Sequence, residues 1–112
     1  MYKQGDIVLI PLPFSDLSSN KKRPVLVLSD DHYNTLTDDM IVAAITSNID
    51  NKIYTVTITQ DDLSDGMLLH ESSIRADKLY TLSQSIILKK FGTVKNEVVS
   101  SVVNKLFLIF TH

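Results

Sequence analysis

The chain has 112 residues, a formal net charge of -2 and no cysteine. This length suits a single domain over residues 1–112 with its own hydrophobic core. Without cysteine, disulfide bonds, a thiolate nucleophile and cysteine-based zinc sites are excluded. The sequence lacks both the roughly 18 consecutive apolar residues of a membrane span and the pattern of a signal peptide. We therefore expect a cytoplasmic protein that does not associate with membranes.

The first part of the sequence predicts two short strands with a loop between them. Residues 6–10 form a short β-branched run that is stopped by Pro11 and Pro13, because proline cannot donate a hydrogen bond to a sheet. Residues 13–22 are rich in turn-forming side chains and predict an exposed loop that can contact a substrate. Residues 25–28 are apolar at every position, which predicts a strand with both faces covered.

The middle of the chain predicts further strands. Residues 29–39 hold few apolar side chains and predict a loop with about one helical turn. A strand is predicted at residues 40–45. Residues 53–59 alternate Thr with larger side chains, as in a half-buried strand with one polar face. Gly66 then introduces a short apolar segment, and residues 74–82 predict another strand.

The end of the chain predicts a helix. Residues 83–88 predict either a short helical turn or a bend into a last strand that ends near Gly92. With Asn96 as the expected N-cap, apolar residues then recur at the three- and four-residue spacing of an amphipathic helix. They are Val98, Val99, Val102, Val103, Leu106, Phe107 and Phe110. The predicted fold is mainly β: five or six short strands in a small curled barrel, with this C-terminal helix lying on the sheet.

Polar side chains stand at the ends of two predicted strands. Arg23 comes just before the second strand, and Thr46 and Ser47 follow directly after the third. A cation beside two hydroxyl groups suits a phosphate group that undergoes cleavage, because the guanidinium offsets developing negative charge while hydroxyls donate hydrogen bonds. The alternative is that Arg23 is a solvated charge at a strand end.

Several motifs occur in a characteristic order. They are residues 5–11, the pair Pro13 and Phe14, residues 22–28, residues 41–47, the pair Ile74 and Arg75, and the final helix. No motif is diagnostic alone, but together they resemble the MazF/PemK family of toxin endoribonucleases over nearly the whole chain. Residues 77–82 are most similar to the single-domain PemK-like branch. The resemblance implies an SH3-like barrel, cleavage of single-stranded RNA, a homodimer and a cognate antitoxin of a type II toxin-antitoxin system.

The resemblance also implies roles for individual residues. Arg23 and Thr46 match the catalytic arginine and threonine of the family. Arg23 is expected to bind the phosphate through two hydrogen bonds, and Thr46 is expected to donate a third hydrogen bond to it. Candidates for binding the RNA substrate are Ser47, Lys22, Arg75 and Phe14.

Two of these binding candidates have structural alternatives. Arg75 can pair with Asp77 or with the acidic doublet at residues 61–62 instead of contacting RNA. Phe14 can either stack on a base or fill the hydrophobic core.

RNA cleavage without a metal ion uses the ribose 2′-hydroxyl as nucleophile, so some group has to accept its proton. Arginine is a poor base near neutral pH. By residue type, His70 and Glu71 are the candidate acceptors, although on one strand they would point to opposite faces, and each can instead be a surface residue. Because the histidines are isolated and the acidic doublets show no metal-binding pattern, we expect no metal and no cofactor.

Two other functions are compatible with the sequence. Small barrels of this type also host non-enzymatic modules that bind topoisomerases or peptides, and a degenerate toxin without activity is a third possibility. The net charge of -2 favours a binding module, because RNA-binding domains are usually basic. The combination of Arg23 with the hydroxyl pair favours an enzyme, and the basic cluster at residues 21–23 supplies local positive charge.

Overall fold

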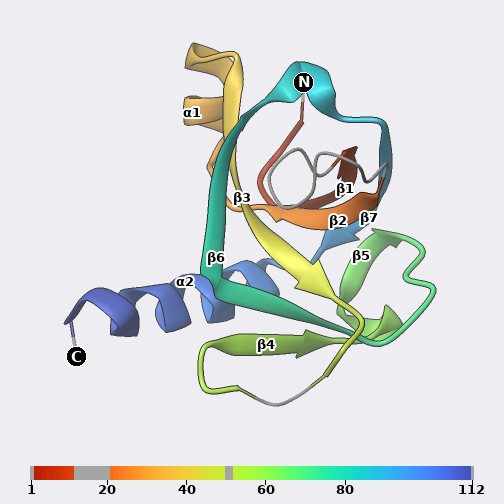
Figure 1. Ribbon diagram of the computed structural model, residues 1–112, viewed down its shortest axis with the longest axis vertical. Coiled ribbons are helices and arrows are strands. Elements are labelled where there is room, and N and C mark those ends of the chain that lie inside the picture. Colours follow the sequence, from red (N-terminus) through yellow and green to blue (C-terminus); the bar gives the residue numbers. More distant parts are fainter. Residues whose placement is uncertain (1, 12–20, 50–51, 112) are drawn as a thin grey trace.

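The computed structural model describes residues 2–11, 21–49 and 52–111 (Figure 1). Their elements, in chain order, are β1 (Asp6–Pro11), β2 (Lys22–Val27), α1 (Asp31–Leu36), β3 (Asp39–Thr46), β4 (Thr55–Ile58), the 3-10 turn η1 (Gln60–Asp62), β5 (Leu63–Gly66), β6 (Ser72–Ser83), the 3-10 turn η2 (Gln84–Ile86), β7 (Lys89–Val94) and α2 (Asn96–Thr111).

The strands form one antiparallel sheet of seven strands in the order β4-β6-β3-β2-β1-β7-β5. The sheet curls into a half-barrel, and α2 packs against β4 and β6 (Figure 1). The predicted mainly β fold with a C-terminal helix is therefore confirmed. The predicted number of strands was too low because β5 has no alternating apolar pattern. Its Ser64 and Asp65 are exposed, and it is recognisable only by its pairing with β7.

Both faces of the sheet are covered, so the hydrophobic core has two parts. One part lies between the sheet and α2 and includes Leu26, Val98 and Val102. The other lies inside the curl and includes Val25 and Val27. Consecutive residues of β2 alternate between the two parts, because successive side chains of a strand point to opposite faces. This alternation confirms the prediction, from its unbroken apolar run, that the second strand is covered on both faces.

The pairing of β6 with β3 is interrupted by a bulge. Ala43 lies opposite Leu79, whereas the next residue, Ala44, lies opposite Arg75. Residues 76–78 of β6 therefore have no counterpart on β3. The strand turns sharply in this region (Figure 1). Its first part pairs with both β3 and β4, whereas the part after the turn pairs with β3 but not with β4. Bulges of this kind bend a strand and re-aim its side chains.

The start of β1 is fixed by Gly5 and Asp6. Gly5 has φ = +94°, in the left-handed region that favours glycine. The buried carboxylate of Asp6 accepts hydrogen bonds from the Lys3 N–H and the Thr93 hydroxyl, both at 2.9 Å. The ammonium group of Lys90 lies 3.3 Å from the same carboxylate. Asp6 thus ties together the N-terminal turn and β7.

Three further segments can be compared with the prediction. Helix α1 supplies the expected helical turn, and Asp30 caps it by accepting a hydrogen bond from the Tyr33 N–H at 2.8 Å. Between β6 and α2 the alternatives both occur, since the 3-10 turn η2 is followed by the strand β7. Helix α2 begins at Asn96, so Asn96 is its first residue and not the expected N-cap.

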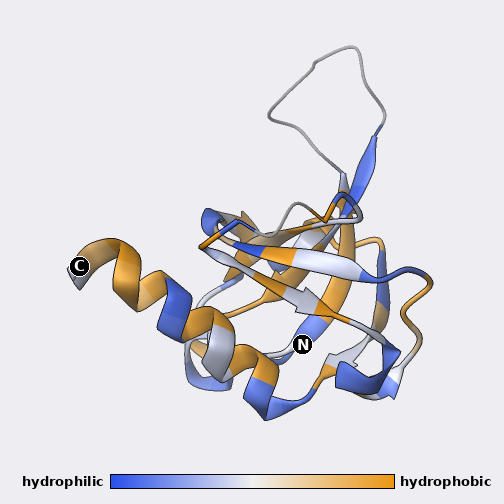
Figure 2. Ribbon diagram, turned by 90° about the horizontal axis from the view of Figure 1, so that it is seen from below, coloured by the Kyte–Doolittle hydropathy of each residue, from blue (hydrophilic) through white to orange (hydrophobic). Residues whose placement is uncertain are grey.

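Helix α2 packs on the sheet mainly with its first half, and Leu106 of its second half also packs against the core. Val98 and Val102 are buried, whereas Phe107 and Phe110 are 63% and 78% exposed. The end of the helix extends past the sheet (Figure 1), and hydrophobic residues continue along this part of it (Figure 2). The predicted amphipathic helix on the sheet is confirmed, but its apolar stripe continues beyond the sheet, so Phe107 and Phe110 are exposed. Within the described residues, no helix is long and apolar enough to span a membrane.

Candidate active site

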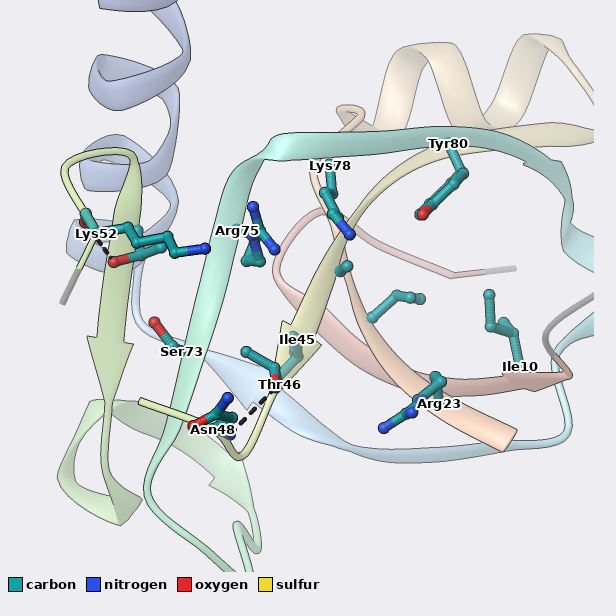
Figure 3. Close-up of a pocket in the computed structure, with 13 residues that line it drawn as sticks. Ile10, Arg23, Ile45, Thr46, Asn48, Lys52, Ser73, Arg75, Lys78 and Tyr80 are labelled. Carbon is teal, nitrogen blue, oxygen red and sulfur yellow. Dashed lines mark hydrogen bonds between the residues drawn. The ribbon is translucent and has the colours of Figure 1, made fainter. Parts of the chain in front are cut away.

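A pocket of about 370 Å³ lies at the concave side of β2, β3 and β6, where the bulge bends β6 (Figure 3). Side chains from five strands and from the segment between β3 and β4 line it. They are Ile10, Arg23, Val25, Ala44, Ile45, Thr46, Asn48, Lys52, Thr55, Ser73, Arg75, Lys78 and Tyr80.

The strand register explains why Arg23 and Thr46 share this pocket. Residues that lie directly opposite each other in an antiparallel sheet point to the same face, and so do residues two apart on one strand. Val25 lies opposite Ala44. Arg23 lies two residues before Val25, and Thr46 lies two residues after Ala44. The two side chains that the sequence singled out therefore emerge side by side on the concave face, from neighbouring strands.

The hydroxyl group of Thr46 is already oriented. Its Oγ1 accepts a hydrogen bond from the backbone N–H of Asn48 at 3.1 Å (Figure 3). A hydroxyl has one donor hydrogen besides its acceptor lone pairs. The N–H of Asn48 occupies the acceptor side of Thr46, so the Thr46 hydrogen can be donated to an anion in the pocket.

Arg75 lines the same pocket from β6 and is held by Asp77. Its Nε and Nη2 donate to the two carboxylate oxygens of Asp77 at 3.1 and 2.8 Å. The hydrogen bond with Arg75 lowers the pKa of Asp77 below its usual value, and the charge of Arg75 acts in the same direction. The alternative in which Arg75 pairs with Asp77 is confirmed, and this pairing does not remove Arg75 from the pocket wall.

The described wall of the pocket is strongly cationic. Its charged side chains are Arg23, Lys52, Arg75 and Lys78, and it contains no carboxylate. Arg23 lies on one side, and the other three lie across the pocket from it (Figure 3). Clustered cations around a concave surface create a positive local potential even when the net charge of the protein is negative. An anion such as a nucleic-acid phosphate is the ligand that this wall favours.

The floor of the pocket is apolar. Ile10 and Val25 belong to the core inside the curl, and the half-buried Tyr80 packs against the same core. An aromatic ring next to apolar side chains can receive a nucleobase, since every base has an apolar face that stacks. The pocket thus combines anion-binding walls with a floor suited to a base.

Other residues predicted from the sequence lie away from the pocket. Lys22 and Ser47 are exposed neighbours of the two catalytic candidates and do not line it. His70 and Glu71 are exposed in the segment between β5 and β6 and do not line it either. Because this segment is not a strand, the expectation that they point to opposite faces does not apply. Phe14 and most of the predicted loop at residues 13–22 lie outside the described residues.

Several pocket residues were not predicted: Asn48, Lys52, Ser73, Lys78 and Tyr80. Strand alternation could have indicated Ser73, which lies two residues before Arg75. It could not have indicated Lys78 and Tyr80. Regular alternation along β6 would place both on the face opposite Arg75, but the bulge shifts the alternation and brings them to the same face as Arg75. In the part of the chain that the structure describes, no group of three or more His, Asp or Glu side chains could hold a metal ion.

Comparison with known protein families identifies the family of this chain. A model of the PemK-like, MazF-like toxins of type II toxin-antitoxin systems matches residues 3–110. The chain belongs to this toxin family. The resemblance seen in the order of the sequence motifs is therefore confirmed. No curated protein sequence matches the chain significantly.

Solved structures share the fold of this family member along almost its entire length. MazF from Deinococcus radiodurans has a TM-score of 0.78 at 23% identity, with 99% of this chain and 97% of that chain covered. A MazE-MazF complex from the same organism has a TM-score of 0.78 at 24% identity, with 96% and 94% covered. An endoribonuclease in complex with its cognate antitoxin from a mycobacterial species has a TM-score of 0.77 at 18% identity, with 96% and 93% covered. At these identities the likeness concerns the fold.

Proposed function

We propose that this toxin-family protein cleaves single-stranded RNA in the cytoplasm, at selected sequences and without a metal ion, with Arg23 and Thr46 as catalytic residues. One observation carries the proposal: a guanidinium and an oriented hydroxyl, from two neighbouring strands, line one cationic pocket. The names of similar structures agree with it, since two from mycobacterial species are described as endoribonucleases.

The proposed reaction is an internal transfer at phosphorus. The ribose 2′-oxygen loses its proton and forms a bond to phosphorus, while the bond to the 5′-oxygen breaks and that oxygen gains a proton. The products are a 2′,3′-cyclic phosphate and a 5′-hydroxyl. Arg23 contacts two phosphate oxygens and offsets the charge that builds on them in the transition state. Thr46 donates its hydroxyl hydrogen to one of these oxygens.

The acceptor of the 2′-hydroxyl proton is a separate question. We keep His70 and Glu71 as its candidates, although neither lines the pocket and a general base has to come within hydrogen-bond distance of the 2′-oxygen. His70→Ala and Glu71→Ala should be compared with Arg23→Ala. The acceptor is the residue whose removal lowers the cleavage rate as far as removal of Arg23 does. If both variants keep the wild-type rate, neither residue is the acceptor.

Metal independence and selectivity are tested together on a long RNA in excess EDTA. We expect cleavage to persist, with a 2′,3′-cyclic phosphate on one product and a 5′-hydroxyl on the other. Sequencing of the new 5′ ends should show a shared motif around the cut. Cleavage that appears only after Mg²⁺ or Mn²⁺ is added contradicts the mechanism. RNA binding without cleavage under both conditions favours the binding-module function, which is also the function that the net charge of -2 favours.

We also propose a cognate antitoxin as the partner of this protein. Similar structures from a mycobacterial species and from Deinococcus radiodurans are complexes of the toxin with its antitoxin. A small protein encoded next to this gene is the candidate. Its addition at a one-to-one ratio should abolish RNA cleavage, and a co-purified complex that still cleaves at the full rate contradicts this role.

A homodimer is the proposed assembly, because α2 exposes apolar side chains from its middle to its end that a second copy can cover. They are Val103, Phe107, Leu108 and Phe110. Light scattering at micromolar concentration should give about twice the chain mass of 12.6 kDa. The double variant Phe107→Glu, Phe110→Glu should be monomeric and folded. A wild-type mass near that of one chain contradicts the dimer.

A further inference from the structure

One buried polar atom in the pocket is left unsatisfied. Ser73 is 1% exposed, and its hydroxyl oxygen has no hydrogen-bond partner among the described residues. Buried hydroxyl groups in folded proteins are almost always paired, because water no longer compensates for a missing partner. It is the one side-chain atom of this kind that the described part of the chain contains. Its position therefore needs a reason other than stability.

Ser73 lies at the centre of the polar side of the pocket. On β6 it is directly opposite Thr46 of β3, and on its other side it is opposite Thr57 of β4. Arg75 follows two residues later on the same face. Figure 3 shows the Ser73 side chain between Thr46 and Lys52. The unsatisfied hydroxyl is thus next to the catalytic candidate and beside cations.

We propose that Ser73 binds the RNA substrate by donating its hydroxyl hydrogen to a phosphate oxygen beside the one that Thr46 contacts. Its two neighbours Thr46 and Arg75 are both donors to anions, so the group that fits between them is an acceptor with negative charge. A serine hydroxyl moves between staggered positions by rotation about a single bond, which lets it turn toward a bound strand. Ser73 is then a substrate-binding residue that the free protein keeps at a cost in stability.

This proposal rests on the proposed function, and it predicts opposite effects on stability and binding. Ser73→Ala removes a buried group that has no partner, so the melting temperature should stay the same or rise. The same variant loses a hydrogen bond to an anion, so affinity for a single strand should fall by about tenfold. A serine with only a structural role cannot give this combination, since its loss would lower stability and leave the affinity of the folded protein unchanged.

The preceding residue offers a matched control. Ser72 is also buried, but it points to the other face of β6 and does not line the pocket. Its hydroxyl donates to the His70 carbonyl oxygen at 2.9 Å. Ser72→Ala should therefore lower the melting temperature and leave single-strand affinity at the wild-type value, the reverse of the result for Ser73→Ala.

The experiment measures both quantities on the full chain. The binding probe is a short fluorescent single-stranded DNA of random sequence, which lacks the 2′-hydroxyl and cannot be cleaved by the proposed reaction. Fluorescence anisotropy gives the affinity, thermal unfolding gives the stability, and cleavage of a long RNA is followed in parallel. A fall in affinity for this DNA excludes the 2′-hydroxyl as the group that Ser73 contacts, because the probe carries none.

The outcomes separate this inference from the proposed function. Weaker DNA binding by Ser73→Ala, with stability kept, supports the inference even if no RNA is cleaved, and the missing cleavage then counts against the enzyme alone. Wild-type DNA affinity in Ser73→Ala overturns the inference, whether or not RNA is cleaved. If Ser73→Ala loses stability as Ser72→Ala does and keeps its affinity, Ser73 is structural. A wild-type protein that does not bind the DNA overturns the inference, and if it also leaves the RNA uncleaved, it overturns both proposals.

Discussion

Arg75 and Asp77 form a two-point ion pair across the start of the β6 bulge. The guanidinium donates from Nε and Nη2 to both carboxylate oxygens, at 3.1 and 2.8 Å. Asp77 belongs to the segment that has no counterpart on β3, so the pair joins the regular part of β6 to its irregular part. A bidentate contact fixes the plane of the guanidinium as well as its position. Asp77 therefore orients an arginine that lines the pocket.

The Arg75 and Asp77 pair predicts a small loss of stability in acid. Because Arg75 lowers the pKa of Asp77 from its usual 3.8, the pair stabilises the fold fully above that value. Its contribution disappears as the pH falls through the lowered pKa. The effect should be small, because the carboxylate is 36% exposed and solvent screens the pair.

Thermal unfolding of the wild type and Asp77→Asn, from about pH 6 to about pH 2.5, tests this pair. The wild type should melt slightly higher at the upper end of the range, and the two melting temperatures should converge at the lower end. A difference that stays constant across the whole range contradicts the assignment.

Lys78 should contribute to RNA affinity through charge. It lines the pocket across from Arg23. Each phosphate contact with a single strand adds about 0.7 to the slope of log affinity against log salt concentration. Lys78→Ala should therefore weaken binding at low salt and reduce that slope by about 0.7. Binding titrations at several salt concentrations measure both effects.

Lys95 is the matched control for Lys78, because it is exposed at the end of β7 and does not line the pocket. Lys95→Ala should leave the salt slope close to that of the wild type. If the two lysine variants change the slope equally, the cations act through the overall charge of the protein, and the pocket wall has no special role.

Asp6 should matter for stability and not for chemistry. Its buried carboxylate accepts hydrogen bonds from Lys3 and Thr93 and faces the Lys90 ammonium group. Removing one member of such a network leaves the other members unpaired. Asp6→Ala should lower the free energy of unfolding by about 3 kcal/mol. Denaturant unfolding measures the change. The cleavage rate per folded molecule should remain at the wild-type level, and a stability unchanged by the substitution contradicts this role.

The elements predicted well from the sequence are those with a strong local pattern. The apolar run of β2 reflects burial on both faces, and the helical spacing of α2 reflects one apolar stripe. Strand β5 lacks such a pattern, because its exposed Ser64 and Asp65 leave only the pairing with β7 to define it. The pairing of two distant segments cannot be predicted from the pattern of either segment alone, so β5 could not be predicted in this way.

The same distinction applies to the pocket. Arg23 and Thr46 were predicted because each adjoins an apolar run within a recognisable motif. Ser73 is also in the pocket, and strand alternation could have placed it there because it lies two residues before Arg75. Lys78 and Tyr80 are there because the β6 bulge changes the direction in which residues after it point. Register and bulges depend on the whole sheet, so this part of the site needed the structure.

Arg23→Ala shows whether Arg23 is catalytic, with RNA cleavage in EDTA measured on protein that circular dichroism shows to be folded. The rate should fall by about 10² to 10³, the usual effect of removing one donor that stabilises a transition state. Arg23→Lys should recover only part of it, because lysine keeps the charge and loses the planar fork. Lys22→Ala, next in sequence but outside the pocket wall, should cost at most a few-fold. A folded Arg23→Ala that cleaves RNA at the wild-type rate contradicts the account and makes Arg23 a solvated charge at a strand end.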